Sequence, residues 1–244
     1  MNYDESQQVV LGLVLAAMMF GVALELKLAH FRFVLRKPLP VMIGLICQCL
    51  LLPWLTLLVT LFLDLRPGLE LGMMLVACCP GGNMSNIITH LARGNTALSV
   101  SVTSVSSLLA IITLPLNFAL ISSLNPETAA FLAGEMGTLD VDSGGIVMGL
   151  LLMLVLPLLS GMLVGNLFPR FTQLILPLFK RLSMSAFGLF LGIAIYTNWD
   201  MLVANVGLIF LLVVAQNAAA LLLGWSAASL FGVADGDRRA LTIE

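Results

Sequence analysis

Charged residues are scarce in this 244-residue chain, and their scarcity excludes most classes of soluble protein. Asp, Glu, Lys and Arg together make up 10% of the residues, whereas hydrophobic residues make up 60%. A soluble domain has about 25% charged residues, so this much apolar surface needs lipid as its solvent. The formal net charge of −2 also lacks the basic excess that a nucleic-acid partner requires.

The sequence also lacks the residue patterns of catalysis, metal binding and ATP hydrolysis. Its two histidines, His30 and His90, have no accompanying Ser, Asp or Cys arrangement typical of a catalytic triad. G-x-S-x-G, H-E-x-x-H and Walker motifs are absent. The four cysteines lie in apolar segments without C-x-x-C spacing, which favours a packing role over a metal site. We therefore expect neither an enzyme nor a bound cofactor.

Long apolar runs are what the sequence has in abundance. A helix that crosses a bilayer needs roughly 20 mostly apolar residues, and seven runs have about that length. The predicted spans are residues 7–28, 38–63, 69–91, 94–123, 143–168, 180–198 and 201–232, and a further helix begins at 240–244. We therefore predict an all-α integral membrane protein, a multi-span helical bundle that forms one transmembrane domain over residues 1–244.

The basic residues are distributed unevenly among the predicted loops. If each run crosses the membrane once, ten of the eleven Lys and Arg residues fall on one side, and only Arg66 falls on the other. Loops rich in Lys and Arg stay in the cytoplasm. We therefore expect the N-terminus outside and residues 235–239 in the cytoplasm of a multi-pass plasma-membrane protein, or an inner-membrane protein in a bacterium.

A proline and two glycines interrupt the third predicted span near its middle. Pro80 removes a backbone donor and clashes with the preceding turn, and Gly81 and Gly82 add conformational freedom. We therefore predict a break in this helix. In lipid, such a break is tolerated only where protein or a water-filled cavity covers the backbone. The alternative is a plain proline kink that binds no ligand.

Polar residues follow this break at once and recur in the next span. Asn83, Ser85 and Asn86 can cap a second half-helix, whose N-terminus suits an anionic ligand. The side-chain oxygens of Ser85 and Asn86 suit a hard cation such as sodium. In the fourth span, Ser99 and Thr103 are four residues apart and share one helix face. Close helix packing by small residues is the alternative there.

Other polar residues lie within apolar surroundings. Gln48 needs hydrogen-bond partners at mid-membrane, and an isolated Gln more often makes an interhelical hydrogen bond than binds a ligand. Gln216 and Asn217 are interpreted in the same way, with packing favoured further. Glu244 follows a stretch that turns apolar after Arg239. An acid inside the membrane is costly and indicates a functional site, and a solvated terminal acid is the alternative.

Taken together, these residues resemble the bile acid:sodium symporter family. The resemblance is strongest in one block of the third span and continues into the fourth. That block reads Cys79-Pro80-Gly81-Gly82-Asn83-Met84-Ser85-Asn86, followed by Leu91-Ala92-Arg93-Gly94-Asn95, Ala97-Leu98-Ser99-Val100 and Val102-Thr103-Ser104. Residues 238–244 resemble a second family block, and residues 21–25 resemble the first helix of nine-span members.

The resemblance implies an inverted-repeat secondary transporter fold, with a broken helix in each repeat. It implies a first sodium site that comprises Ser85, Asn86, Ser99, Thr103 and Glu244. It also implies a second sodium site that includes Gln48 and Glu244. The half-helix terminus at Gly82 and Asn83 would face the substrate.

The function that the resemblance implies is sodium-coupled symport of organic anions, bile acid-like or smaller carboxylates, by alternating access. Sodium ions, the organic anion and membrane lipid are then the partners; the oligomeric state is not readable from the sequence. A passive anion or ion channel, or a transporter of a different oxyanion within a related fold, is the alternative. The family continues past its glutamate with a G-x-Q-N motif and two more spans, whereas this chain ends at Glu244. We therefore expect an incomplete second repeat and no transport by the 244-residue chain alone.

Overall fold

The computed structural model describes residues 37–63, 65–136 and 159–244, with a few isolated positions before residue 37 and at 156–157. The predicted spans at 7–28 and 143–168 therefore lie largely outside the described residues. In the described ranges all regular secondary structure is helical. The fold class of this part of the chain is thus all-α.

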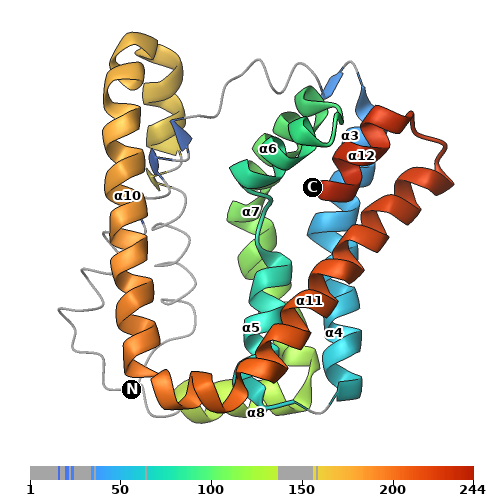
Figure 1. The fold of residues 1–244 in the computed structure, drawn as a ribbon, viewed down its shortest axis with the longest axis vertical. Helices are drawn as coiled ribbons and strands as arrows, with labels where there is room; N and C mark the ends of the chain where they lie inside the picture. Colours follow the sequence, from blue (N-terminus) through green and yellow to red (C-terminus); the bar gives the residue numbers. More distant parts are fainter. Residues whose placement is uncertain are drawn as a thin grey trace. The chain divides into compact units, whose positions relative to one another are not determined.

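Helices α3 to α8 follow one another with short connections, as do α10 to α12 (Figure 1), and the helices with assigned bounds are named in chain order. They are α3 (Pro38–Ile46), the π-helical turn η1 (Cys47–Leu51), α4 (Leu52–Leu63), α5 (Pro67–Cys78), α6 (Asn83–Leu91), α7 (Thr96–Leu124), α8 (Pro126–Met136), α10 (Pro169–Thr197), α11 (Trp199–Leu230) and α12 (Asp235–Ile243). Within the described ranges, three helical stretches are long and apolar enough to cross a membrane: Pro38–Leu63, Thr96–Leu124 and Leu202–Leu230. Each of the three overlaps a predicted span.

The chain divides into two compact units. The first unit comprises residues 1–28 and 148–212, and the second comprises residues 29–147 and 213–244. In the first unit, the rings of Phe20 and Phe179 lie with centroids 5.4 Å apart, which places Phe20 against α10. All residues of the candidate site belong to the second unit.

Helix α7 is central to the second unit because it takes part in both of its apolar clusters. One cluster joins α7 to α3, α11 and α12 and contains Val41, Leu98, Val102, Ala228 and Leu241. The other joins α7 to α4 and α5 and contains Leu57, Met74, Cys78 and Ile121. Because lipid tails are as apolar as these side chains, close packing between the helices holds such clusters together.

The third predicted span is interrupted where its proline and glycines lie. Helix α5 ends at Cys78 and α6 begins at Asn83. Between them the backbone is extended, with ψ of 142° at Cys79 and 171° at Gly82. A plain proline kink would leave the helix continuous, so the interruption is a true break that exposes the start of α6.

The C-terminal cap of α6 contains an arginine whose backbone conformation favours glycine. Arg93 has φ of 54°, its N–H donates to His90 O (3.1 Å), and Gly94 N–H donates to Thr89 O (2.8 Å). This pair of bonds is a Schellman motif, in which the left-handed position is usually glycine. The side chain of Arg93 therefore imposes strain that a glycine would not.

We expect the substitution Arg93→Gly to stabilise the protein by about 0.5–1 kcal/mol, because a left-handed residue with a Cβ costs about 1–2 kcal/mol and the greater flexibility of unfolded glycine offsets part of the gain. Thermal unfolding in detergent would measure the change. Arg93→Ala is the matched control, since it removes the same charge but keeps the Cβ. Equal shifts for both variants would contradict the strain explanation.

Candidate cation-binding site

The five residues predicted for the first sodium site meet where α6, α7 and the end of α12 come together. The carboxylate of Glu244 accepts a hydrogen bond from Ser85 Oγ of α6 (2.8 Å). It accepts two more from α7, from Ser99 Oγ (2.7 Å) and from Thr103 Oγ1. Two helices thus direct hydroxyl oxygens toward the carboxylate at the end of a third.

The amide of Asn86 joins the same group of oxygens. Its Oδ1 accepts from Ser99 Oγ (2.7 Å) and from Thr103 Oγ1 (3.2 Å). Asn86 and Ser85 are neighbours in the first turn of α6, directly after the helix break. The break therefore brings both side chains to the depth of Ser99 and Thr103. We call Ser85, Asn86, Ser99, Thr103 and Glu244 the oxygen cluster.

The oxygen cluster has too few protons for its contacts. A hydroxyl has a single proton to donate. The hydroxyls of Ser85, Ser99 and Thr103 nevertheless make seven close contacts with acceptor oxygens, including the carbonyls of Gly82 (2.6 Å) and Ser99 (3.0 Å). Three protons cannot give each of the seven contacts a hydrogen bond of its own, so the oxygens keep lone pairs that no proton serves. A small cation among them would be coordinated by those lone pairs.

The charge of Glu244 also favours a bound cation. The residue is half-buried, and the ion pairs found in the described residues join Lys37 to Asp237 and Arg238 to Asp235, so neither compensates it. A buried carboxylate without a positive partner is costly. The described ranges contain no group of three or more His, Cys, Asp or Glu side chains that could hold a metal ion. Hydroxyl, amide and carboxylate oxygens are instead ligands for a hard cation.

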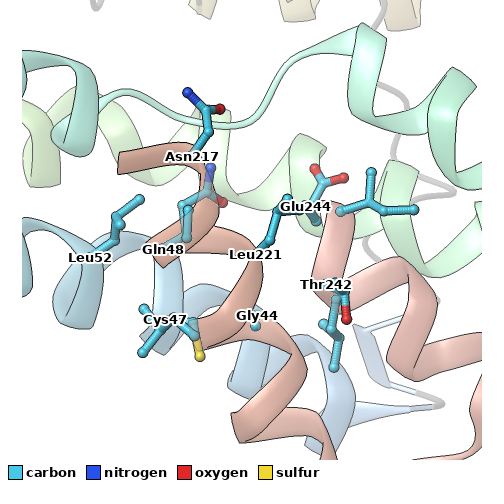
Figure 2. Close-up of a pocket in the computed structure, with 13 residues that line it drawn as sticks. Gly44, Cys47, Gln48, Leu52, Asn217, Leu221, Thr242 and Glu244 are labelled. Carbon is cyan, nitrogen blue, oxygen red and sulfur yellow. The ribbon is translucent and has the colours of Figure 1, made fainter. Parts of the chain in front are cut away.

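Gln48, predicted for the second sodium site, lies beside Glu244 at a cavity of about 160 Å³ (Figure 2). Its Oε1 is buried and has no hydrogen-bond partner among the described residues, which costs about 1–3 kcal/mol. Gly81 of the helix break completes this group. A Cβ added to Gly81 would lie 2.7 Å from Glu244 Oε1 and 3.3 Å from Gln48 Nε2.

Sequence reasoning missed two features of this region. Gln48 lies on the π-helical turn η1. Such turns are frequent at functional sites, but no residue pattern predicts one. Gly81 was interpreted only as part of the break, although its missing side chain makes room for Glu244 and Gln48. The run Pro80–Gly82 was the signal from which that close approach could have been suspected.

The predicted substrate-facing terminus lies at the start of α6. Gly82 is the N-cap of α6, and its carbonyl accepts from the backbone N–H of Ser85 (3.1 Å). A Cβ added to Gly82 would have no neighbouring atom within 4 Å, so this terminus is open on one side. Asn83 is the first residue of α6, and its side chain lies outside the described residues.

Gln216 makes the interhelical hydrogen bond favoured for it, whereas Asn217 bonds within its own helix. Gln216 Nε2 donates to the carbonyl of Met73 on α5 (2.9 Å). Asn217 Nδ2 donates within its own helix, to the carbonyl of Val213 (2.8 Å), although the residue also lines the cavity of Gln48. Neither amide contacts the oxygen cluster in the described hydrogen bonds.

Comparison with known proteins gives the same family. Residues 12–205 match the family described as the sodium bile acid symporter family. The chain is 31% identical to the uncharacterized sodium-dependent transporter YocS of Bacillus subtilis, over 94% of this chain and 68% of that protein. It is 28% identical to the probable chloroplastic sodium/metabolite cotransporter BASS1 of Arabidopsis thaliana, over 100% of this chain and 57% of that protein.

A third relative is the ileal sodium/bile acid cotransporter of Homo sapiens, which is 29% identical over 68% of this chain and 45% of that protein. The chain thus spans roughly half to two thirds of the length of these curated relatives. The family match covers most of the chain, and the relatives are sodium-dependent transporters rather than enzymes. The chain therefore belongs to the sodium bile acid symporter family, a family of sodium-coupled membrane transporters.

Proposed function

We propose that this chain carries the cation-binding core of a sodium-coupled symporter for organic anions. The observation that supports this most strongly is the oxygen cluster, in which three hydroxyls crowd a carboxylate with fewer protons than contacts. Sodium is the coupling ion, because a monovalent hard cation balances the single charge of Glu244. Relatives whose names include sodium/metabolite and sodium/bile acid cotransporter support the same assignment.

The proposed anion site is the start of α6. Backbone N–H groups at a helix N-terminus carry partial positive charge and bind carboxylates readily. Gly82 leaves that terminus without an overlying side chain, and Asn83 adds an amide at the first helical position. The substrate class is a bile acid-like anion or a smaller carboxylate.

Coupling follows from what sodium does to the three helices. Bound sodium neutralises Glu244 and ties α6, α7 and α12 through shared oxygen ligands. Because Ser85 and Asn86 immediately follow the anion-binding terminus, ordering them also orders that terminus. A ligand shifts a conformational equilibrium when it binds one state better, so sodium favours the state that accepts the anion. Alternating access in an inverted-repeat fold then moves both ligands across the membrane.

We also propose the orientation with residues 235–239 in the cytoplasm. At one end of the second unit, Lys37 pairs with Asp237 (2.7 Å) and Arg239 donates to the carbonyl of Ala92 (3.2 Å). Three predicted cytoplasmic segments therefore meet there. On predicted outer segments, Asn125 Nδ2 donates to Glu70 (2.8 Å). These pairings support alternate crossing of the intervening spans, with the N-terminus outside.

The matched pair Ser99→Ala and Ser101→Ala tests the proposed sodium site. Both serines are buried on α7, but Ser101 Oγ donates only to its own helix, at the carbonyl of Ala97 (2.7 Å). We expect Ser99→Ala to raise the sodium concentration for half-maximal thermal stabilisation about tenfold, which corresponds to about 1.4 kcal/mol. Ser101→Ala should leave it unchanged.

The measurement is thermal unfolding of the detergent-solubilised chain while sodium chloride replaces potassium chloride at constant ionic strength. Constant ionic strength removes general salt effects, so only a selective site responds. If Ser99→Ala retains the half-saturating sodium concentration of the unmodified chain, the oxygen cluster is not the sodium site.

A further inference from the structure

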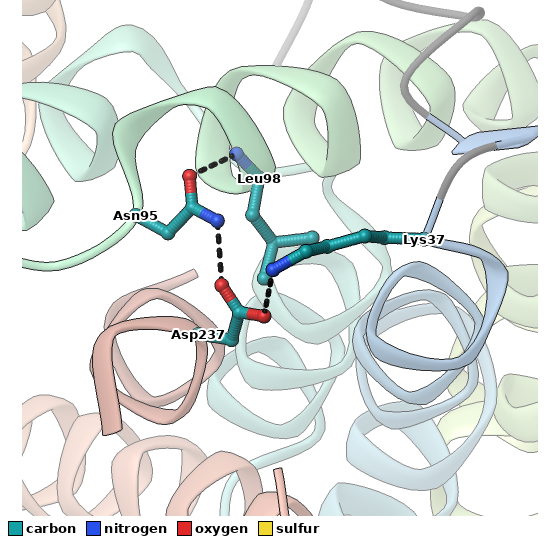
Figure 3. A network of polar contacts seen from close by, with 4 residues as sticks. All are labelled: Lys37, Asn95, Leu98 and Asp237. Carbon is teal, nitrogen blue, oxygen red and sulfur yellow. Dashed lines mark hydrogen bonds and ion pairs between the residues drawn. The ribbon is translucent and has the colours of Figure 1, made fainter. Parts of the chain in front are cut away.

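A buried acid at the other end of α12 forms a second polar network, apart from the oxygen cluster. The side chain of Asp237 is 7% exposed. Its carboxylate accepts from Lys37 Nζ (2.7 Å) and from Asn95 Nδ2 (2.5 Å), as Figure 3 shows. None of these three residues contacts Glu244 in the described hydrogen bonds. We call Lys37, Asn95 and Asp237 the α12 anchor.

The α12 anchor joins the beginnings of three helices. Lys37 is the N-cap of α3, and Asn95 is the N-cap of α7, where its Oδ1 accepts from Leu98 N–H (3.2 Å). Asp237 lies in the first turn of α12. The backbone N–H of Asn95 also donates to the carbonyl of Gly236 (2.8 Å). Side chain and backbone therefore both fix the start of α12 against the start of α7.

The spacing along the two helices links the anchor to the oxygen cluster. On α7, the N-cap Asn95 is followed at intervals of four by Ser99 and Thr103, so all three lie on one face. From Asn95 to Thr103 the helix rises about 12 Å, and from Asp237 to Glu244 about 10.5 Å. Helices α7 and α12 therefore run in the same direction, with matched contacts at both ends.

Packing between the two ends makes α12 a rigid connection. Ala240 is fully buried and Leu241 nearly so, in the cluster that contains Leu98 and Val102. On the other side, a Cβ added to Gly224 of α11 would lie 3.1 Å from the Cα of Thr242. A displacement at Asp237 is therefore carried along the helix to Glu244 rather than absorbed between them.

We propose that the α12 anchor is a positioning device that sets the register of α12 on α7, and thereby holds Glu244 within reach of Ser99 and Thr103. Asp237 is its central residue, because it is the acceptor that both other members share. The inference rests on the proposed function, since it holds that the anchor determines sodium affinity without touching the ion. A shift of about one ångström at Glu244 is enough to take its carboxylate out of hydrogen-bond distance of these hydroxyls.

The test compares Asp237→Asn with Asp235→Asn in the purified 244-residue chain. Both acids lie in the first turn of α12, so both interact favourably with the positive end of the helix dipole. Asp235 is exposed and instead pairs with Arg238 of its own helix (2.7 Å). We expect Asp237→Asn to raise the half-saturating sodium concentration at least fivefold, and Asp235→Asn to leave it within twofold of the unmodified chain.

A second pair of variants tests the anchor at Lys37, the N-cap of α3. Lys37 is 47% exposed, so its replacement is tolerated better than that of a buried residue. Lys37→Met should weaken sodium affinity as Asp237→Asn does, whereas Lys37→Arg retains the donor and should restore it. A merely structural ion pair would lower the unfolding temperature in potassium and sodium equally, without moving the sodium midpoint.

The outcomes separate the two proposals. If the unmodified chain shows no sodium-selective stabilisation, the proposed function fails, and this inference fails with it. If the unmodified chain responds to sodium but Asp237→Asn and Lys37→Met keep its midpoint, the positioning role alone is overturned. A raised midpoint in both variants, with Asp235→Asn and Lys37→Arg unchanged, supports the anchor.

Discussion

Replacing Glu244 with Gln should abolish the stabilisation of this chain by sodium while leaving its stability in potassium equal or higher. Three hydroxyls direct their oxygens at this carboxylate, so its charge is what balances a bound cation. The neutral amide has the same shape but cannot balance it. The amide also removes a half-buried charge that no basic side chain among the described residues pairs with, which is why stability without sodium should not fall.

The size of the effect follows from mass action. A ligand present at about 100 times its dissociation constant stabilises the folded state by about 2.7 kcal/mol. In a chain of this size, each kcal/mol raises the unfolding temperature by about 2–4 °C. The unmodified chain should therefore gain several degrees in saturating sodium, and Glu244→Gln should gain none.

Glu70→Gln is the control for Glu244→Gln, because Glu70 is a glutamate of the second unit that is buried even more completely. It is 1% exposed, and it accepts from Leu65 N–H (3.1 Å) and from Asn125 Nδ2 (2.8 Å). Its replacement should lower the unfolding temperature in both salts and leave the sodium response intact. Loss of the sodium response in both variants would contradict the assignment of Glu244, because replacing a glutamate outside the oxygen cluster would then have the same effect.

The second large effect is expected at the helix break, from Gly81→Ala. The new Cβ would lie 2.7 Å from Glu244 Oε1, so the carboxylate must move. Because that carboxylate ends a flexible side chain, its movement costs little stability but displaces it from Ser99 and Thr103. We expect the half-saturating sodium concentration to rise at least tenfold, with the unfolding temperature in potassium nearly unchanged.

Gly72→Ala is the matched control for Gly81→Ala. Gly72 lies in α5, the helix before the break, and a Cβ added there would meet no atom within 4 Å. It should leave the sodium midpoint unchanged and stabilise the helix by up to about 1 kcal/mol. If sodium titration gives the same midpoint for both glycine variants, the close approach of the break to Glu244 plays no part in cation binding.

The residue pattern within a single segment predicted the helix break and the shared face of Ser99 and Thr103, because the conformation of one segment decides both. Pro80 with Gly81 and Gly82 cannot continue a helix, and the helix does end before them. Ser99 and Thr103 are four residues apart and face the same partners. Ser101, by contrast, donates to the carbonyl of Ala97 in its own helix.

Contacts between distant segments could not be predicted from local pattern. Glu244 lies 141 residues from Thr103, and only the family resemblance connected the two. The ion pair of Lys37 and Asp237 spans 200 residues, and sequence analysis counted Lys37 only as a loop charge. The π-helical turn η1 adds one residue to a helical turn, and in a span that is apolar nearly throughout this shift leaves no recognisable pattern.

The central claim is that the oxygen cluster binds sodium selectively, and equilibrium binding of radioactive sodium to the purified chain in lipid nanodiscs tests it most directly. The account predicts saturable binding that excess potassium does not displace, that Ser101→Ala retains and that Glu244→Gln abolishes. Binding that fails to saturate, that potassium displaces equally well or that survives in Glu244→Gln would contradict it.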